Sequence, residues 1–301
     1  MPTTENSRTL HAVKVRYRSP SHPLSLWAKA TPVSKICMGL LLLFVILAVF
    51  APLIAPHSPS AQKLLYRLRP PLGIERAVSG YILGTDELGR DILSRCLYAL
   101  RVSMGLAFLG SLIGAFIGGG LGLLSGLGGK WTDTAIMGFV DAQIAIPFTL
   151  IAVFIVAVAG SGLHVLVAVL GIAYWEQYAR LIRAQTLSLK ESLFVTASRS
   201  MGAGSLRVAL SHIAPNIVSP LIVMFTLNFS NIVLLESTLS FLGLGVQPPT
   251  ASLGSMIGQG RDYMADAWWL VASPSFFIVA VALVILLLGD WLREALDVKT
   301  S

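Results

Sequence analysis

The residues of this chain that could carry out chemistry are few and widely spaced. Its five histidines are scattered without an H-E-x-x-H pattern, and its two cysteines, Cys37 and Cys96, lack the spacing of a metal site. The GLGGKW stretch is not a phosphate-binding loop, because that motif would need Gly at Leu124 and Ser or Thr at Trp131. We therefore expect no catalytic residue, no metal and no cofactor site in this chain.

The composition instead indicates a membrane protein. Hydrophobic residues make up 55% of the 301 positions, charged residues only 12%, and the mean hydropathy is +0.76. A soluble core needs less apolar sequence than this. Six apolar segments are long enough to cross a bilayer as helices, at about 1.5 Å per residue. They cover residues 36–54, 102–127, 134–159 (with a kink expected at Pro147), 163–181, 216–235 and 269–288.

One of these segments carries more polar side chains than an anchor needs. Asn228 and Asn231 lie within the fifth segment, and Glu236 follows it directly. A polar group in hydrocarbon costs free energy unless it meets water or a partner. These three residues are our candidates for lining a passage. Hydrogen bonding between packed helices is an alternative of comparable weight.

Glycine recurs at every fourth position of the second segment. Residues four apart share one face of a helix, and a face without side chains lets a neighbouring helix approach closely. We therefore predict a packing face rather than a cofactor loop. The glycines concerned are Gly110, Gly114, Gly118, Gly122 and Gly126.

The distribution of charge predicts how the chain is oriented. Residues 1–35 form a basic tail with a single acid, Glu5, so by the positive-inside rule this tail lies in the cytoplasm. Residues 36–98 then hold the first helix and an outer segment, although several arginines of that segment run against the rule. Residues 99–301 hold the other helices, and both termini are cytoplasmic. The net charge of +7 follows from this topology and does not indicate a nucleic-acid partner.

A polar stretch, residues 190–215, separates the fourth and fifth segments. Its apolar positions follow a helical spacing twice, at Leu193, Phe194, Ala197 and Met201 and again from Leu206 to Ile213. Two short amphipathic helices are expected. Gly202 and Gly204 should end the first, Ser205 should cap the second, and Pro215 should end it.

The outer segment ends in GTDELGRD, residues 84–91, followed by ILSR. We expect Thr85 or Asp86 to cap a helix, Gly89 to turn the backbone, and Arg90 and Asp91 to form ion pairs. A structural role is favoured over substrate contact. The stretch resembles the signature G-T-D-x-x-G-R-D of permease subunits of bacterial ABC importers, in their dipeptide, oligopeptide and nickel branch. The signature positions are Gly84, Thr85, Asp86, Gly89, Arg90 and Asp91.

The polar stretch is similar to the cytoplasmic coupling loop of the same family, which reads E-A-A, three residues, Gly, nine residues, then I-x-L-P. Several positions differ, since Thr196 replaces the Glu and Ser198 replaces the second Ala. The resemblance implies docking into an ATPase subunit, and an ordinary amphipathic loop is the alternative. The matching positions are Thr196, Ala197, Ser198, Gly202, His212 and Pro215. SFLGLGVQPP (240–249) and GDWLREALD (289–297) resemble the family further.

This resemblance implies an all-α integral membrane protein with six transmembrane helices in the type I ABC importer permease fold, located in the bacterial inner membrane. It implies as partners a second homologous permease, two ABC ATPases that bind ATP and Mg, and an extracytoplasmic substrate-binding protein. The favoured substrate is a dipeptide or oligopeptide, with nickel chelates or glutathione as alternatives. A membrane enzyme is the remote alternative, and a passive channel would not need a coupling loop.

Overall fold

The computed structural model describes residues 30–296, and these residues form helices joined by turns and loops. The long helices follow the apolar segments of the sequence. They are α2 (Pro32–Val49), continued by the single turn α3 (Ala51–Ile54), α4 (Ile92–Leu127), α5 (Lys130–Ala145), α6 (Phe148–Ala159), α7 (Leu163–Gly171), α8 (Trp175–Lys190), α11 (Ala214–Phe241) and α13 (Trp269–Leu296).

Five of the described helical stretches are long and apolar enough to cross a membrane, and α5 with α6 adds a sixth if the pair is one broken span. The expected kink at Pro147 is in fact a break of 88° between these two helices. Ile146 takes an extended conformation, φ −111° and ψ 129°, because a residue that precedes proline is crowded out of the helical region. The third predicted segment is therefore two helices.

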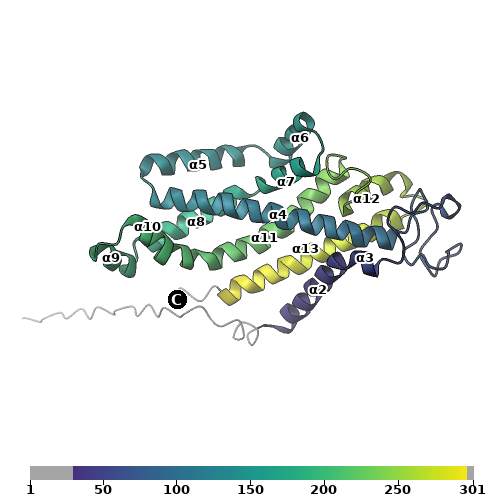
Figure 1. Cartoon of the computed structure of the whole chain (residues 1–301), viewed down its shortest axis with the longest axis horizontal. Coiled ribbons are helices and arrows are strands. Elements are labelled where there is room, and N and C mark those ends of the chain that lie inside the picture. Colours follow the sequence, from purple (N-terminus) through teal and green to yellow (C-terminus); the bar gives the residue numbers. More distant parts are fainter. Residues whose placement is uncertain (1–29, 297–301) are drawn as a thin grey trace, which may run out of the picture.

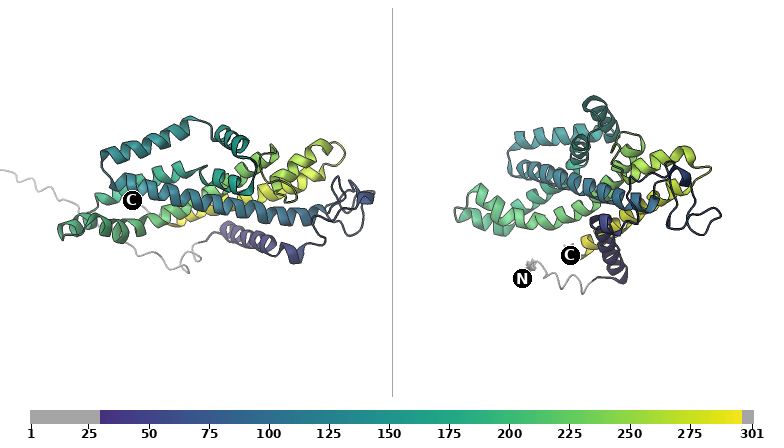
Figure 2. Two further views of the ribbon diagram at one scale, coloured as in Figure 1. Left: turned by 45° about the horizontal axis from the view of Figure 1, so that its top comes forward. Right: turned by 45° about the vertical axis from the view of Figure 1, so that its right-hand side comes forward.

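The helices run back and forth along one axis of the molecule (Figure 1). The outer segment, residues 55–91, lies at one end of this axis, and the short helices α9 (Leu193–Ser200) and α10 (Ser205–Val208) lie at the other. The start of α2 and the end of α13 both point away from the outer segment, as the two turned views in Figure 2 also show. The described ends of the chain therefore lie on the same side of the bundle.

Helix α4 begins ten residues before the segment predicted from hydropathy. Its N-cap is Asp91, whose carboxylate accepts a hydrogen bond of 2.9 Å from the backbone N–H of Ser94. The expectation that Thr85 or Asp86 caps this helix is therefore wrong. Hydropathy marks only the part of a helix that suits lipid, whereas a capped polar turn continues the same helix outside it. As a result Cys96, expected in the outer segment, lies buried within α4.

The apolar core joins α2, α4, α11 and α13, and many large apolar side chains nevertheless remain exposed. Phe116 is 84% exposed, Phe154 68% and Phe276 68%. A water-soluble protein rarely leaves so much apolar surface open. These outward faces suit the hydrocarbon of a bilayer.

The glycine face of α4 lies against α7 and α8. A Cβ atom added at Gly118 would lie 2.1 Å from the carbonyl oxygen of Trp175, and one at Gly122 would lie 2.5 Å from that of Ala179. Any side chain at these positions would force the two helices apart. The other three glycines approach the same pair of helices: Gly110 faces Leu170, Gly114 faces Gly171, and Gly126 faces Thr186.

Candidate functional site

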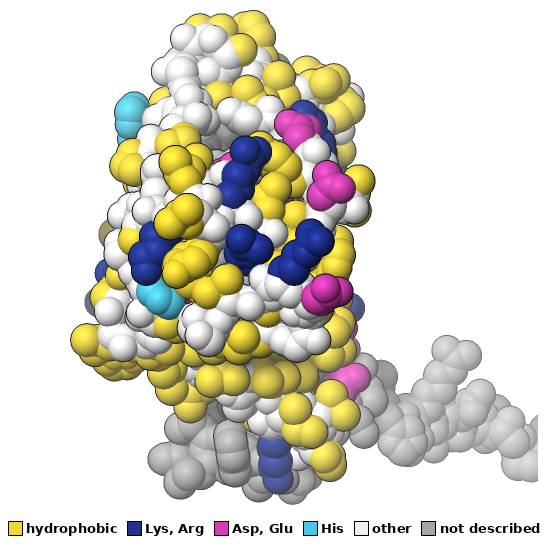
Figure 3. All heavy atoms as spheres, turned by 90° about the vertical axis from the view of Figure 1, so that its right-hand side faces the viewer, with side chains coloured by type: hydrophobic (Ala, Val, Ile, Leu, Met, Phe, Trp, Pro, Cys, Tyr) yellow, Lys and Arg dark blue, Asp and Glu magenta, His cyan; other side chains and the backbone are white. Residues whose placement is uncertain are grey.

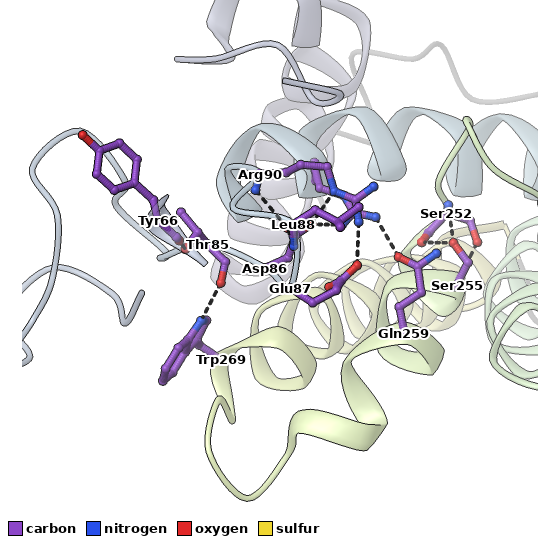
Figure 4. A network of polar contacts seen from close by, with 11 residues as sticks. Tyr66, Thr85, Asp86, Glu87, Leu88, Arg90, Ser252, Ser255, Gln259 and Trp269 are labelled. Atoms are coloured by element: carbon purple, nitrogen blue, oxygen red, sulfur yellow. Dashed lines mark hydrogen bonds and ion pairs between the residues drawn. The ribbon is translucent and has the colours of Figure 1, made fainter. Parts of the chain in front are cut away.

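Asp86 is the centre of a buried polar network at the outer end of the bundle (Figure 4). Its Oδ1 accepts hydrogen bonds of 2.9 Å from the backbone N–H groups of Leu88 and Arg90. Its Oδ2 accepts from Nε of Arg90 at 2.6 Å and also from Nη1 of Arg95. One carboxylate thus closes the turn of the signature and joins it to α4.

Two further contacts join this network to distant parts of the chain. Nη2 of Arg95 donates to Oε1 of Gln259 at 2.8 Å, which reaches helix α12 (Leu253–Gly260). Nε1 of Trp269, the first residue of α13, donates to the carbonyl oxygen of Thr85 at 3.1 Å. The signature therefore ties the outer segment to the start of α4, the end of α12 and the start of α13 (Figure 4).

Two glycines let the outer segment pack this closely. Gly84 has φ +80° and Gly89 has φ +71°, a left-handed region that glycine adopts without steric cost. A Cβ at Gly89 would lie 1.9 Å from the carbonyl oxygen of Lys63, and a Cβ at Gly84 would lie 2.5 Å from that of Arg69. Both positions need glycine for conformation and for space.

Both Arg90 and Asp91 have a partner of opposite charge, but the partner of Asp91 is His57, whose Nδ1 lies 3.8 Å from Oδ2 of Asp91 and forms an ion pair only when the imidazole is protonated. Arg90 pairs with Asp86 and, through Nη2, with Glu87 at 2.8 Å. Asp91 also accepts hydrogen bonds from the N–H and hydroxyl of Ser94, at 2.9 and 2.6 Å. Asp91 differs from Arg90 in that its carboxylate caps the first turn of α4.

The candidate passage residues of α11 do not share one environment. Glu236 is fully buried and accepts hydrogen bonds from Ser103 on α4 at 2.9 Å and from Ser240 at 2.6 Å. Asn228 is also fully buried, whereas Asn231 is exposed. The structure thus brings Glu236 and Asn228 into the helix packing and leaves Asn231 on an open face.

Sequence reasoning missed a second polar cluster, where α5 meets α8. Gln143 accepts from Nε1 of Trp175 at 2.5 Å and donates to Glu176 and to the carbonyl of Ile172, both at 2.9 Å. Glu176 is only 6% exposed, so its carboxylate lies inside the packing of the helices. A signal was present, since Gln143 and Glu176 both interrupt apolar segments, but their pairing depends on how the helices cross.

An ion pair joins these two helices at their other end. Asp133 pairs with Nε of Arg183 at 2.5 Å, and both groups of the pair are about a third exposed or less. Asp141 pairs with Arg180 at 2.6 Å, and the Asp141 side chain is 67% exposed. Helix α5 is therefore fastened to α8 mainly by polar contacts.

The polar stretch at residues 190–215 folds into a helical hairpin. Its first helix, α9, ends where Gly202 and Gly204 predicted. Gly202 has φ +87°, and the N–H groups of Gly202 and Ala203 donate to the carbonyls of Arg199 and Ser198 at 2.9 and 3.1 Å. These two bonds form a Schellman motif, which needs a left-handed residue at the first position after the helix.

The second helix differs from the prediction at both ends. Gly204 is the N-cap without a side-chain hydrogen bond, so Ser205 does not cap it. After α10 the chain passes through one π-helical turn, Ala209–Ile213, directly into α11, and Pro215 lies in the first turn of α11. Proline is tolerated there because the first N–H groups of a helix have no intrahelical partner. Pro215 therefore starts a helix rather than ending one.

The hairpin packs on the bundle through one face and exposes another. Val195, Val208 and Ile213 are completely buried in a small apolar core with Ile182 of α8. Ser198 and His212 meet across the hairpin, with Oγ and Nε2 3.1 Å apart, whereas Thr196, Ala197 and Pro215 are exposed. Ala197 was expected on the apolar stripe that packs, but Val195 and Ser198 are buried in its place.

Large apolar side chains project from the outward face of the hairpin. They are Leu193, 89% exposed, Met201, 83%, Leu206, 73%, and Leu210, 60%. This end of the molecule is far from the outer segment (Figure 1). Exposed apolar patches of this kind are typical of surfaces that contact another protein or a membrane.

The structure offers no metal-binding group of three or more His, Cys, Asp or Glu within residues 30–296. Cys37 and Cys96 are both buried and free.

A family comparison decides what this bundle is. Residues 118–301 match the model of the binding-protein-dependent transport system inner membrane component, and residues 29–71 match the N-terminal TM domain of oligopeptide transport permease C. The chain belongs to the inner-membrane components of binding-protein-dependent transport systems. Members of this family are multi-pass proteins of the inner membrane and act as transport subunits of ABC transporters.

Individual relatives of this inner-membrane component agree with the family model. The chain is 43% identical over 259 residues to a di/tripeptide transport system permease protein DppC of Pseudomonas aeruginosa, which covers 86% of each chain. It is 37% identical over 258 residues to a glutathione transport system permease protein GsiD of Pectobacterium atrosepticum, which covers 86% of this chain and 84% of the relative.

A solved structure shares the fold of this component. One chain of the MetNI methionine ABC transporter, solved in inward-facing conformations, matches with a TM-score of 0.57 at 19% identity. The match covers 68% of this chain and 98% of the MetNI chain. The predicted type I importer permease fold is therefore confirmed.

Proposed function

We propose that this chain is one of two permease subunits of an ATP-driven importer of short peptides. The observation that carries the proposal is the 43% identity to a di/tripeptide permease over 86% of both chains. The second permease, two ATPases that bind ATP and Mg, and an extracytoplasmic binding protein complete the transporter. This subunit carries out no covalent chemistry of its own.

The orientation follows from charge and from the two ends of the bundle. The end with α9 and α10 lies in the cytoplasm, where its exposed Leu206 and Met201 dock into an ATPase subunit. The outer segment faces the binding protein. Both termini are then cytoplasmic, which agrees with the basic residues of the N-terminal tail.

The mechanism couples the two ends through rigid elements. Closure of the ATPases pushes the hairpin, which is continuous with α11 through the π-helical turn and packs on Ile182 of α8. Movement of the hairpin therefore tilts α8 and α11. Asn231, on the exposed face of α11, remains our candidate for lining the path.

Glutathione import is the second candidate, because one of the relatives is a glutathione permease. Nickel chelates are a third, resting only on the branch of the family. The deciding experiment measures ATPase activity of the complete reconstituted transporter with its binding protein and short peptides, glutathione or nickel chelates. Stimulation by peptides is the expected result. Stimulation by glutathione or nickel chelates alone would contradict the peptide assignment.

A further inference from the structure

A cavity of about 940 Å³ opens at the outer end of the bundle. Figure 3 looks onto this end, where Lys and Arg side chains are interspersed with Asp and Glu. The walls come from the outer segment, the first turns of α4, helix α12 and the loop after α11. Residues that line it include Gln62, Glu87, Tyr98, Arg101, Pro249 and Gln259.

Most charges at this cavity are already neutralised. Arg90 pairs with Asp86 and Glu87, at 2.6 and 2.8 Å, and Arg95 pairs with the same Asp86. Arg101 is exposed, and it has no ion pair or hydrogen bond with any residue between 30 and 296. The described lining thus carries one uncompensated positive charge.

Arg101 lies where the polar cavity gives way to apolar surface. It follows the start of α4 by nine residues, about 14 Å along the helix axis, and no charged residue occurs between Arg101 and Leu127. The same side chain lines a second, apolar cavity of about 660 Å³ with Phe108 and Phe229, between α2, α4, α11 and α13. An unpaired charge at the edge of a hydrocarbon segment requires water or an anion beside it.

We propose that Arg101 binds the terminal carboxylate of the peptide in the outer cavity, before the peptide passes between the helices. This inference rests on the proposed peptide import. A guanidinium suits the task because its planar N–H groups match the two oxygens of a carboxylate. The volume of the cavity falls within the range of small-ligand sites, about 300 to 1,000 Å³.

The lining favours a peptide over a lipid headgroup. The cavity extends from Arg101 toward the polar outer segment, where Gln62 and Gln259 offer hydrogen bonds to the peptide backbone. Tyr98 and Pro249 supply apolar surface for peptide side chains. A phospholipid with its headgroup at Arg101 and its chains in the apolar cavity would leave Gln62 and Gln259 of the outer cavity without a partner.

The test compares two peptides in the complete transporter, reconstituted in liposomes with its binding protein. Alanyl-phenylalanine carries a free carboxylate, and its C-terminal amide does not. We expect Arg101→Gln to lower uptake of the free peptide at least about tenfold, the value of one charge-assisted hydrogen bond. Uptake of the amide should change less than about twofold. Each variant is compared with the unaltered complex on the same peptide, so discrimination by the binding protein cancels.

A charge-rescue measurement gives a second readout that does not use the amide. Arg101→Cys is treated with a trimethylammonium or a sulfonate methanethiosulfonate reagent, and Cys37 and Cys96 are buried and shielded from both. The cationic reagent should restore uptake of the free peptide, and the sulfonate should not. Arg101→Lys should keep part of the uptake.

The matched control is Arg261→Gln. Arg261 is an exposed arginine at the same end of the bundle, and within the described residues its one ion pair is with Asp262, which is also exposed.

Equal losses for both peptides, no loss for either, or rescue by both reagents would overturn the role of Arg101. A loss that appears only in liposomes with anionic phospholipid would assign Arg101 to a headgroup and also overturn it. If the unaltered complex imports peptides while Arg101→Gln does not discriminate, this inference alone fails. If the unaltered complex imports no peptide, the proposed function fails, and the inference fails with it.

Discussion

The hydroxyl of Ser103 donates to the buried carboxylate of Glu236 at 2.9 Å and accepts from the backbone N–H of Leu253 at 3.2 Å. These two bonds join α4, α11 and α12. Few groups compete for a hydrogen bond inside a bundle of this kind. The pair Ser103 and Glu236 therefore fixes the relative position of three helices.

Replacing the carboxylate of Glu236 should lower the free energy of unfolding, and the loss should be larger when both hydrogen-bond acceptor oxygens are removed than when one is kept. Glu236→Ala leaves the hydroxyls of Ser103 and Ser240 without their acceptor and opens a cavity, which should cost roughly 2 to 4 kcal/mol. Glu236→Gln keeps the shape and one acceptor oxygen and should cost about 1 kcal/mol. Thermal unfolding of the purified complex measures both. Equal melting temperatures for the two variants would mean that these hydrogen bonds contribute little.

The outer network around Asp86 offers a sharper test, because the buried Arg95 and the partly buried Arg90 both pair with this one carboxylate. Asp86→Asn removes the charge that compensates Arg90 and Arg95, and the Arg95 side chain is only 6% exposed. Breaking a buried pair from one side costs roughly 3 to 5 kcal/mol. We expect protease to cut the variant in the reconstituted complex between residues 55 and 91, and to leave this segment of the unaltered protein intact. Asp262→Asn, which removes an exposed pair at the same end, should leave the cleavage pattern unchanged.

The glycine face of α4 provides a control within the same helix. Gly118→Ala places a Cβ 2.1 Å from the carbonyl oxygen of Trp175, whereas a Cβ at Gly120 meets nothing within 4 Å. We expect Gly118→Ala to separate α4 from α8 and to lower the melting temperature and the yield of folded protein. Gly120→Ala should be neutral or slightly stabilising, since alanine favours a helix by about 1 kcal/mol over glycine. If the two variants behave alike, α4 and α8 do not pack as closely as described.

Some features of the fold could be predicted from the sequence alone. The spacing of Gly110 to Gly126 identified a packing face because periodicity along one helix needs no knowledge of its neighbours. The number of spans followed from hydropathy for the same reason. The break at Pro147 exceeded the expected kink, since a local signal marks the site of a bend but not its angle.

The errors concern features that depend on distant residues. In GTDELGRD the cap was assigned to Thr85 or Asp86 and an ion pair to Asp91, whereas Asp91 caps α4 and Asp86 binds Arg95, which in turn donates to Gln259 of α12. The burial of Glu176 likewise depends on Gln143, more than thirty positions away in the chain. A sequence pattern marks such polar residues as unusual, but it does not show which of them are in contact in the fold.

The hairpin gives a prediction about assembly rather than stability. Leu206 is 73% exposed at the end of the bundle where α9 and α10 lie, so Leu206→Glu should fold normally. If Leu206 docks into an apolar groove of an ATPase subunit, burying the new carboxylate there would be costly, and co-purification of the ATPases should fall at least about tenfold. Leu65→Glu is the matched control, because Leu65 is 87% exposed in the outer segment at the opposite end. ATPase subunits that stay bound to Leu206→Glu would show that this face of the hairpin is not the docking surface. Loss of the ATPases from Leu65→Glu as well would instead point to a general failure of assembly.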